Sequence, residues 1–165
     1  MAYSATIKRQ KQLLIGNGAL IMLFGCLIGL AFVFFLIGKI ALWPIPGEIV
    51  FQLPGTYDAW RMAHMEGLVN GIMLMVVAAS IHLIPFSEKA LSKISLGLIV
   101  IAWANPAASL MDALFENSRG LEMAGPFFNT FAYLLFLPTG LLTLGLLAAI
   151  GYRTLKGAPI AEPEK

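Results

Sequence analysis

Charged residues are scarce in this sequence. They make up 12% of its 165 residues, whereas 59% are hydrophobic. A water-soluble domain usually carries about 25% charged residues, so the low proportion indicates that lipid is the main solvent. The formal net charge of +2 is small and its basic residues are scattered, which argues against a nucleic-acid partner. We therefore predict an integral membrane protein.

Cysteine and histidine are also rare. The one cysteine, Cys26, lies deep in an apolar stretch, so no disulfide framework is possible. His64 and His82 are 18 positions apart, which is roughly 27 Å along a helix, so they cannot share one metal ion. His82 stands next to "LIP" and is expected at a membrane interface. The sequence contains no phosphate-binding glycine loop and no serine or cysteine nucleophile beside a base.

Four apolar runs meet the length of a membrane-spanning helix, about 20 residues. They cover residues 13–37, 65–84, 94–115 and 126–150. The sequence therefore predicts an all-α integral membrane protein with four transmembrane helices in a single domain, residues 1–165. The connection over residues 39–61 contains prolines but stays apolar and aromatic. We expect it to lie at the membrane interface, where it could also serve as a lid over a site below.

The basic residues are distributed unevenly between the two ends of the predicted helices. Eight of the eleven fall on one side and three on the other. The eight are Lys8, Arg9, Lys11, Lys89, Lys93, Arg153, Lys156 and Lys165, and the three are Lys39, Arg61 and Arg119. Because lysine and arginine resist translocation, both termini are expected in the cytoplasm, with the protein in a bacterial-type inner (cytoplasmic) membrane.

The segment "AHMEGLVNG", residues 63–71, opens the second span. By helical periodicity His64, Gly67 and Gly71 share one face. Two glycines beside a histidine would leave a flat strip against which a planar macrocycle could lie while the imidazole binds its metal. Alternatively, the glycines are a helix-packing strip and the histidine is an ordinary interfacial residue.

Glu66 and Asn70 fall on a different face, roughly 120–200° around the helix from His64. A charge at the centre of a bilayer costs about 2.5–3.5 kcal/mol, so an intramembrane acid usually has a role. One helix cannot easily bring both faces into a single pocket of its own bundle. In a cyclic oligomer each helix contributes to two subunit interfaces, so it can present one face to each of two sites. We therefore predict a site shared between subunits.

A second polar group lies in the third span, in "WANPAASLMDALF". Asn105, Ser109 and Asp112 recur at i, i+4 and i+7 and form one polar stripe. Pro106 removes a backbone donor and can kink the helix there. Such a stripe must face protein or a wet cavity. It predicts either part of a site or simple hydrogen bonding between helices.

The order of several motifs resembles the styrene oxide isomerases, small four-span membrane proteins. A proline-rich aromatic loop precedes "AH", an asparagine follows six residues later, and "WAN", "NSRGLEMAGPFFN" and "GYRTLK" come in turn. The resemblance covers roughly residues 14–156. It implies a ferric haem b shared between subunits of a homotrimer, with His64 as the axial ligand and the Asn70 amide near the substrate.

The resemblance also implies the reaction, a redox-neutral rearrangement of an aryl epoxide of the styrene oxide type to an aldehyde. Iron would act as a Lewis acid on the epoxide oxygen, and a hydride would shift to the resulting benzylic cation. A dry pocket suits this small aromatic substrate, since water would trap the cation as a diol. An upstream monooxygenase could supply the epoxide.

Two departures from the family pattern concern the substrate. Ser109 stands where the family has tyrosine, and Ile101 where it has aspartate. Glu66 and Asp112 add acids that the epoxide enzymes lack. The form "AHMEGLVNG" is more similar to hydroxylaminobenzene mutases, which makes rearrangement of an aryl hydroxylamine to an aminophenol the alternative. Two further alternatives are a non-enzymatic membrane haem protein for electron transfer or sensing, and a structural subunit without a cofactor.

Overall fold

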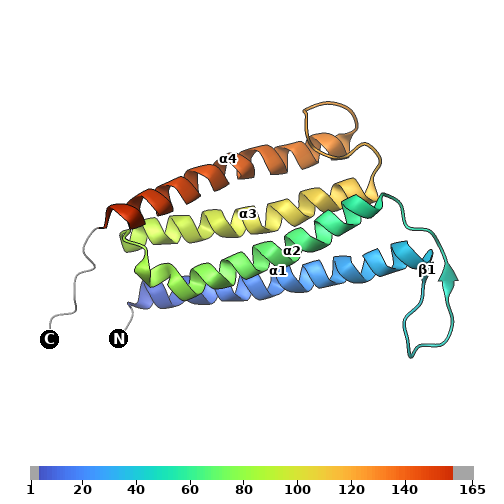
Figure 1. Cartoon of the computed structure of the whole chain (residues 1–165), viewed down its shortest axis with the longest axis horizontal. Coiled ribbons are helices and arrows are strands. Elements are labelled where there is room, and N and C mark those ends of the chain that lie inside the picture. Colours follow the sequence, from blue (N-terminus) through green and yellow to red (C-terminus); the bar gives the residue numbers. More distant parts are fainter. Residues whose placement is uncertain (1–3, 158–165) are drawn as a thin grey trace.

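The computed structural model describes residues 4–157. Four long helices lie side by side and alternate in direction (Figure 1), with a two-stranded hairpin at one end of the bundle. The elements are α1 (Ala5–Ile37), β1 (Lys39–Ile40), β2 (Ile49–Val50), α2 (Tyr57–Ser80), η1 (Ile81–Leu83), α3 (Glu88–Leu114) and α4 (Phe127–Lys156). The helices α1, α3, α4 and α2 extended by η1 are each long and apolar enough to cross a membrane. The prediction of four helices long and apolar enough to span a membrane is confirmed for the described residues.

Three of the helices begin earlier than the apolar runs indicated, because polar residues cap them. The side chains of Ser4, Thr56 and Ser87 accept hydrogen bonds from backbone N–H groups in the first turns of α1, α2 and α3. Such caps satisfy amides that the helix itself leaves unpaired. Hydropathy alone does not detect these polar first turns.

The predicted boundary between the loop over residues 39–61 and the second helix is therefore wrong. Residues 57–61 form the first turn of α2, where Asp58 lies favourably at the positive end of the helix dipole. As a result, His64 lies about two turns inside the helix rather than at its start.

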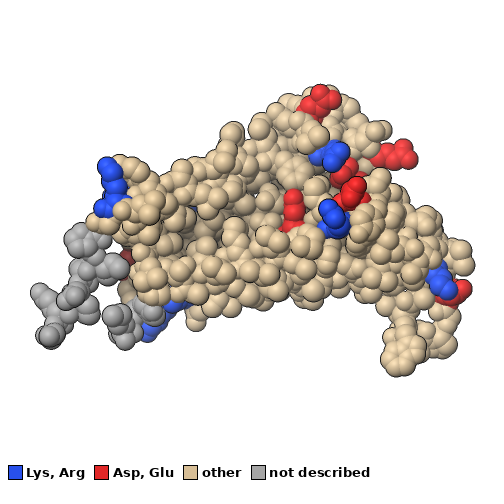
Figure 2. All heavy atoms as spheres, in the orientation of Figure 1, with Lys and Arg blue, Asp and Glu red and all other residues tan. Residues whose placement is uncertain are grey.

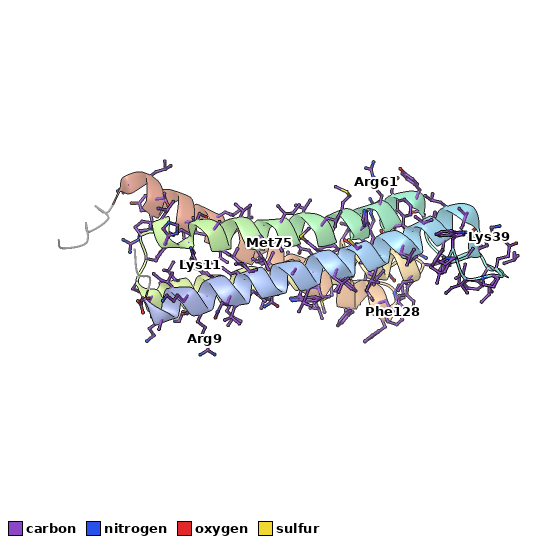
Figure 3. The ribbon with its side chains drawn as sticks, turned by 90° about the horizontal axis from the view of Figure 1, so that it is seen from below. Arg9, Lys11, Lys39, Arg61, Met75 and Phe128 are labelled. Carbon is purple, nitrogen blue, oxygen red and sulfur yellow. The ribbon has the colours of Figure 1, made fainter. Side chains whose placement is uncertain are left out.

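The backbones of α1 and α2 approach closely at paired glycines. A Cβ atom added to Gly67 would lie 2.5 Å from the Cα of Gly25, and one added to Gly18 would lie 2.8 Å from the carbonyl oxygen of Gly71. The two helices lie against each other along their length (Figure 1; Figure 3). Small residues that let backbones approach are typical of helix packing in membranes. Gly67 and Gly71 therefore form a helix-packing strip, which was the alternative interpretation of these glycines.

The core lies between α1, α2 and α3. Leu14, Ile21, Leu74, Leu98 and Ala102 are nearly or completely buried there. Helix α4 packs mainly against α3 and leaves a row of leucines exposed, including Leu134, Leu141 and Leu144. Lipid or another protein chain must cover that apolar face.

The connection between α1 and α2 projects beyond the end of α1 (Figure 1). Gln52 Nε2 donates a hydrogen bond to the carbonyl oxygen of Phe35, and Trp60 Nε1 donates one to that of Pro54. Trp43 at the outer tip is 95% exposed. Only the last residues of the connection, Gly55 and Thr56, line one of the cavities described below, so the hairpin itself does not cover that cavity as a lid. Its place at the membrane interface stays a prediction.

The charges separate between the two ends of the bundle (Figure 2). One end has the starts of α1 and α3 and the ends of α2 and α4 (Figure 1), and it carries the predicted basic residues except Lys165, which lies outside the described residues. The opposite end carries most of the acids, together with Lys39, Arg61 and Arg119. The basic end is the one expected in the cytoplasm, and that orientation stays a prediction.

Replacing Gly67 by alanine is expected to destabilise the protein. The added methyl group would press on the backbone of Gly25, which cannot yield without separating the helices. Overpacking of this kind costs about 1–3 kcal/mol, measurable by thermal unfolding of the detergent-solubilised protein. Gly16→Ala is the control, because nothing lies within 4 Å of its added Cβ. Equal stability of the two variants would contradict the packing described above.

Candidate functional site

Glu66 is held by a hydrogen bond between two helices. The hydroxyl of Ser109 on α3, which is fully buried, donates to Glu66 Oε2 on α2 over 2.6 Å. One turn along α2, Asn70 Nδ2 donates to the backbone carbonyl oxygen of Glu66 over 2.9 Å. The contact with Ser109 fixes the direction of the half-buried carboxyl group of Glu66. The predicted site residues Glu66, Asn70 and Ser109 thus lie together.

Asn105 continues this polar group toward α4. The hydroxyl of Thr139 lies 3.3 Å from Asn105 Oδ1 and also contacts the carbonyl oxygen of Leu135. Helix α3 runs without interruption through the buried Pro106. The sequence analysis missed Thr139, because nothing in the sequence shows which helix faces Asn105.

A shallow, mostly apolar cavity of about 620 Å³, open on one side within the single chain, lies along α4 and reaches Glu66 and Asn105. We call it the inner cavity. Its walls include Leu121, Tyr133, Phe136, Leu137 and Leu141. Ligand pockets typically span roughly 300–1,000 Å³ and combine apolar walls with a few polar groups. The inner cavity therefore suits a small aromatic molecule with one polar end.

A second, polar cavity of about 1150 Å³ opens at the acidic end of the bundle, and we call it the outer cavity. Acidic and basic side chains gather over this region (Figure 2). Those that line it are Asp58, Arg61, Glu66, Asp112, Glu116 and Arg119. Glu66 lines both cavities, whereas Asp112 lines the outer one, near the charge of Arg119. Of the polar stripe on α3, Asn105 thus lines the inner cavity and Asp112 lines the outer cavity.

One side chain shapes the connection between α3 and α4. Asn129, which is 7% exposed, accepts a hydrogen bond from the Gly120 N–H and donates to the carbonyl oxygens of Glu122 and Ala124. Gly120 has a φ of +68° and packs against the backbone of Ala132, which leaves no space for a Cβ. Because Gly120 and Leu121 line the inner cavity, Asn129 positions part of its wall. Sequence reasoning gave Asn129 no role.

His64 lies on the other side of α2, against α1. Its Nδ1 is 2.8 Å from the carbonyl oxygen of Gly25, and a Cβ on Gly29 would lie 2.6 Å from the same nitrogen. Two glycines therefore form a slot for the ring. With Nδ1–H donating to the carbonyl, Nε2 keeps its lone pair, and it has no hydrogen-bond partner in the part of the chain that the structure describes.

Histidines that bind a metal usually have their second ring nitrogen fixed in this way, by a backbone carbonyl or a carboxylate. Within residues 4–157, no group of three or more His, Cys, Asp and Glu side chains could hold a metal ion. His64 can therefore bind a metal only if other ligands, such as those of a macrocycle, hold it as well.

The predicted glycine strip is wrong as a surface for that macrocycle, since the backbone of α1 covers Gly67 and Gly71. Helical spacing places them on the His64 face correctly, but it does not show which element covers that face. The predicted separation of faces agrees with the contacts, because His64 bonds to α1 and Glu66 to α3. His82 lies in η1, at the other end of α2.

The sequence matches known proteins over most of its length. The sequence model of a family described as styrene oxide isomerase matches residues 10–155. The chain is also 31% identical over 148 residues to a styrene-oxide isomerase of Pseudomonas fluorescens, and the match covers 86% of each protein.

Replacing Asn129 by alanine is expected to loosen the connection between α3 and α4. Three hydrogen bonds to main-chain groups are lost, so backbone amides in residues 120–124 should exchange with solvent at least about tenfold faster, as expected for about 1.4 kcal/mol of lost local stability. Hydrogen exchange followed by mass spectrometry measures this. Thr130→Ala, one position along, is the control. Unchanged exchange in the Asn129 variant would show that the connection holds its shape without this side chain.

Proposed function

The chain belongs to the styrene oxide isomerase family, and on that premise we propose that it is a haem-dependent membrane isomerase that converts an aryl epoxide to an aldehyde. Family membership makes it an isomerase, in place of the non-enzymatic haem protein and the structural subunit considered from the sequence. The observation that carries the proposed substrate class is the inner cavity, whose lining is mostly apolar and also includes Glu66 and Asn105.

The proposed reaction neither adds nor removes atoms. The benzylic carbon–oxygen bond of the epoxide breaks, a hydride moves from the neighbouring carbon to the benzylic carbon, and the oxygen becomes a carbonyl. The electron-poor benzylic carbon must be kept from water, which would convert it to a diol. The leucine and phenylalanine side chains of the inner cavity, with lipid or a neighbouring chain over its open side, would exclude water from the ring and the benzylic carbon.

His64 would hold a ferric haem b through Nε2, and the iron, when bound, supplies a Lewis acid for the epoxide oxygen. Two observations support this ligand. The carbonyl oxygen of Gly25 fixes the ring through Nδ1, and His64 lacks the further protein ligands that a bare metal ion would need among the described residues.

We further propose that the site is shared between subunits of a homotrimer. Within one chain, His64 faces α1 while Glu66 faces α3, so a group bound to His64 and the inner cavity lie on different sides of α2. In a cyclic assembly, His64 of each chain would serve the cavity of a neighbour. The exposed apolar faces of α1 and α4 offer surfaces for such an assembly within the bacterial inner membrane.

The polar residues then have separate roles. Glu66 would stabilise the positive charge that develops on the substrate, and Ser109 would orient its carboxyl group. Asn70 and Asn105 would position the substrate oxygen. Asp112 lines the outer cavity, where it would influence the access of substrate to Glu66 and would not contact the reacting atoms. An oxygenase that inserts oxygen into an aryl alkene would supply the substrate.

A second candidate function is the rearrangement of an aryl hydroxylamine to an aminophenol. The Glu66–Ser109 pair supports it, because a carboxylate in the lining of a mostly apolar cavity can accept a hydrogen bond from the N–H or O–H of a hydroxylamine. An epoxide offers no such donor.

Membranes containing the protein should convert styrene oxide to phenylacetaldehyde, as measured by gas chromatography. Glu66→Gln keeps the size of the side chain but removes its charge, and should lower kcat on the order of 100-fold, the size of effect known for loss of one electrostatic contact to a transition state. Val69→Ala, whose side chain is exposed on the surface of α2, is the control. Turnover of phenylhydroxylamine to 2-aminophenol, with styrene oxide left unchanged, would establish the second candidate instead.

Purified wild-type protein should show a haem Soret absorption band that His64→Ala removes, because the mutation deletes the nitrogen that would hold the iron. Asn70→Ala should keep the band while losing activity, since Asn70 lies on another face of α2. His82→Ala is the matched histidine control and should keep both. Loss of haem to the same extent in the Asn70 and His64 variants would contradict the proposed roles.

A further inference from the structure

A third cavity lies toward the basic end of the bundle and shares no lining residue with the two cavities described above. It has a volume of about 320 Å³ and is formed by α1 and α3. Thr6, Arg9, Gln10 and Ser92 supply its polar lining. Leu13, Leu96 and Ile99 supply the apolar part. We call it the end cleft.

The polar and apolar parts of the end cleft follow the same order on both helices. On α1 the lining runs from Thr6 and Arg9 to Leu13, and on α3 from Ser92 to Leu96 and Ile99. Both helices start at the basic end (Figure 1), so in each the polar residues lie nearer that end and the apolar residues lie deeper. From Ser92 to Ile99 the rise is about 10 Å. A ligand that fits must have a polar head toward the helix ends and an apolar tail along the helices.

A hydrogen bond closes the base of the polar part. Gln10, which is 8% exposed, donates from Nε2 to Ser92 Oγ over 3.1 Å, and the Ser92 hydroxyl donates in turn to the carbonyl oxygen of Glu88. The first of these bonds joins α1 to α3 beside Arg9 and holds the two walls of the cleft together, and the second fixes the Ser92 hydroxyl on α3.

Arg9 supplies the charge of the end cleft. Its side chain is exposed, and no carboxylate lies within ion-pair distance of it among the described residues. Arg9 and Lys11 leave α1 on different sides (Figure 3), so Arg9 alone of the two lines the cleft. The nearby carboxylate of Glu88 is engaged by the hydroxyls of Ser4 and Thr6, and Lys89 and Lys93 add positive charge at the start of α3.

We propose that the end cleft binds one anionic phospholipid. The guanidinium of Arg9 binds the phosphate, which it can contact through two parallel N–H groups, and one acyl chain lies along Leu13, Leu96 and Ile99. Basic pockets between membrane helices bind phospholipid head groups in this manner. The apolar half of the cleft distinguishes a lipid from free phosphate, which would leave that half without contacts.

Native mass spectrometry of the full-length protein tests this proposal. The detergent-purified protein is mixed with equal amounts of phosphatidylglycerol and phosphatidylcholine that have identical acyl chains. Wild type should retain phosphatidylglycerol in preference to phosphatidylcholine. Arg9→Gln should lower that preference about fivefold, the value expected for one basic side chain near an anionic surface. Lys11→Gln, which removes the same charge from the other side of α1, should keep it.

A second variant tests the apolar half. Leu96→Trp should fill the apolar half of the end cleft and reduce retention of both lipids. The fold should tolerate the change because the Leu96 side chain is 63% exposed. Equal retention of the two lipids by wild type would overturn the proposal. So would equal effects of the Arg9 and Lys11 changes, since the charge would then act diffusely. Displacement of the lipid by inorganic phosphate would show a phosphate site and overturn the lipid assignment.

Discussion

The close contact between the backbones of α1 and α2 is the constraint on which the rest of the structure depends. Lipid offers no hydrophobic force between helices, so association relies on close packing and hydrogen bonds. The glycines at positions 18, 25, 67 and 71 allow that packing. Their contact fixes the rotation of α2, which turns His64 into the slot on α1 and turns Glu66 toward α3. Both halves of the proposed chemistry follow from one helix–helix contact.

The fold could be predicted from the sequence where length and hydropathy decide it, and less well where single contacts do. The four apolar runs identified the four helices, but Thr56 extends α2 by two turns and moves His64 inward. Helical spacing separated the His64 face from the Glu66 face correctly. It could not show that α1 covers Gly67 and Gly71, because spacing gives directions on a helix and not the neighbour in each direction.

The candidate site was predicted in part for the same reason. Glu66, Ser109 and Asn105 were found because polar residues are conspicuous in an apolar span, and the structure brings them together. Thr139 and Asn129 were missed, since threonine and asparagine are common in helices and loops and only their hydrogen-bond partners distinguish these two. The haem and the trimer rest on partners outside a single chain, so they stay predictions.

The bonding of Asn129 has a consequence for how the substrate range of this enzyme can change. The hydrogen bonds of the Asn129 side chain all go to main-chain atoms of the connection, at Gly120, Glu122 and Ala124. The path of that segment is therefore largely independent of the side chains it carries beyond Gly120. Leu121, which lines the inner cavity and is largely exposed, can be exchanged without altering the backbone that supports it. Evolution or a library can thus reshape one end of the cavity at this position while the four helices stay as they are.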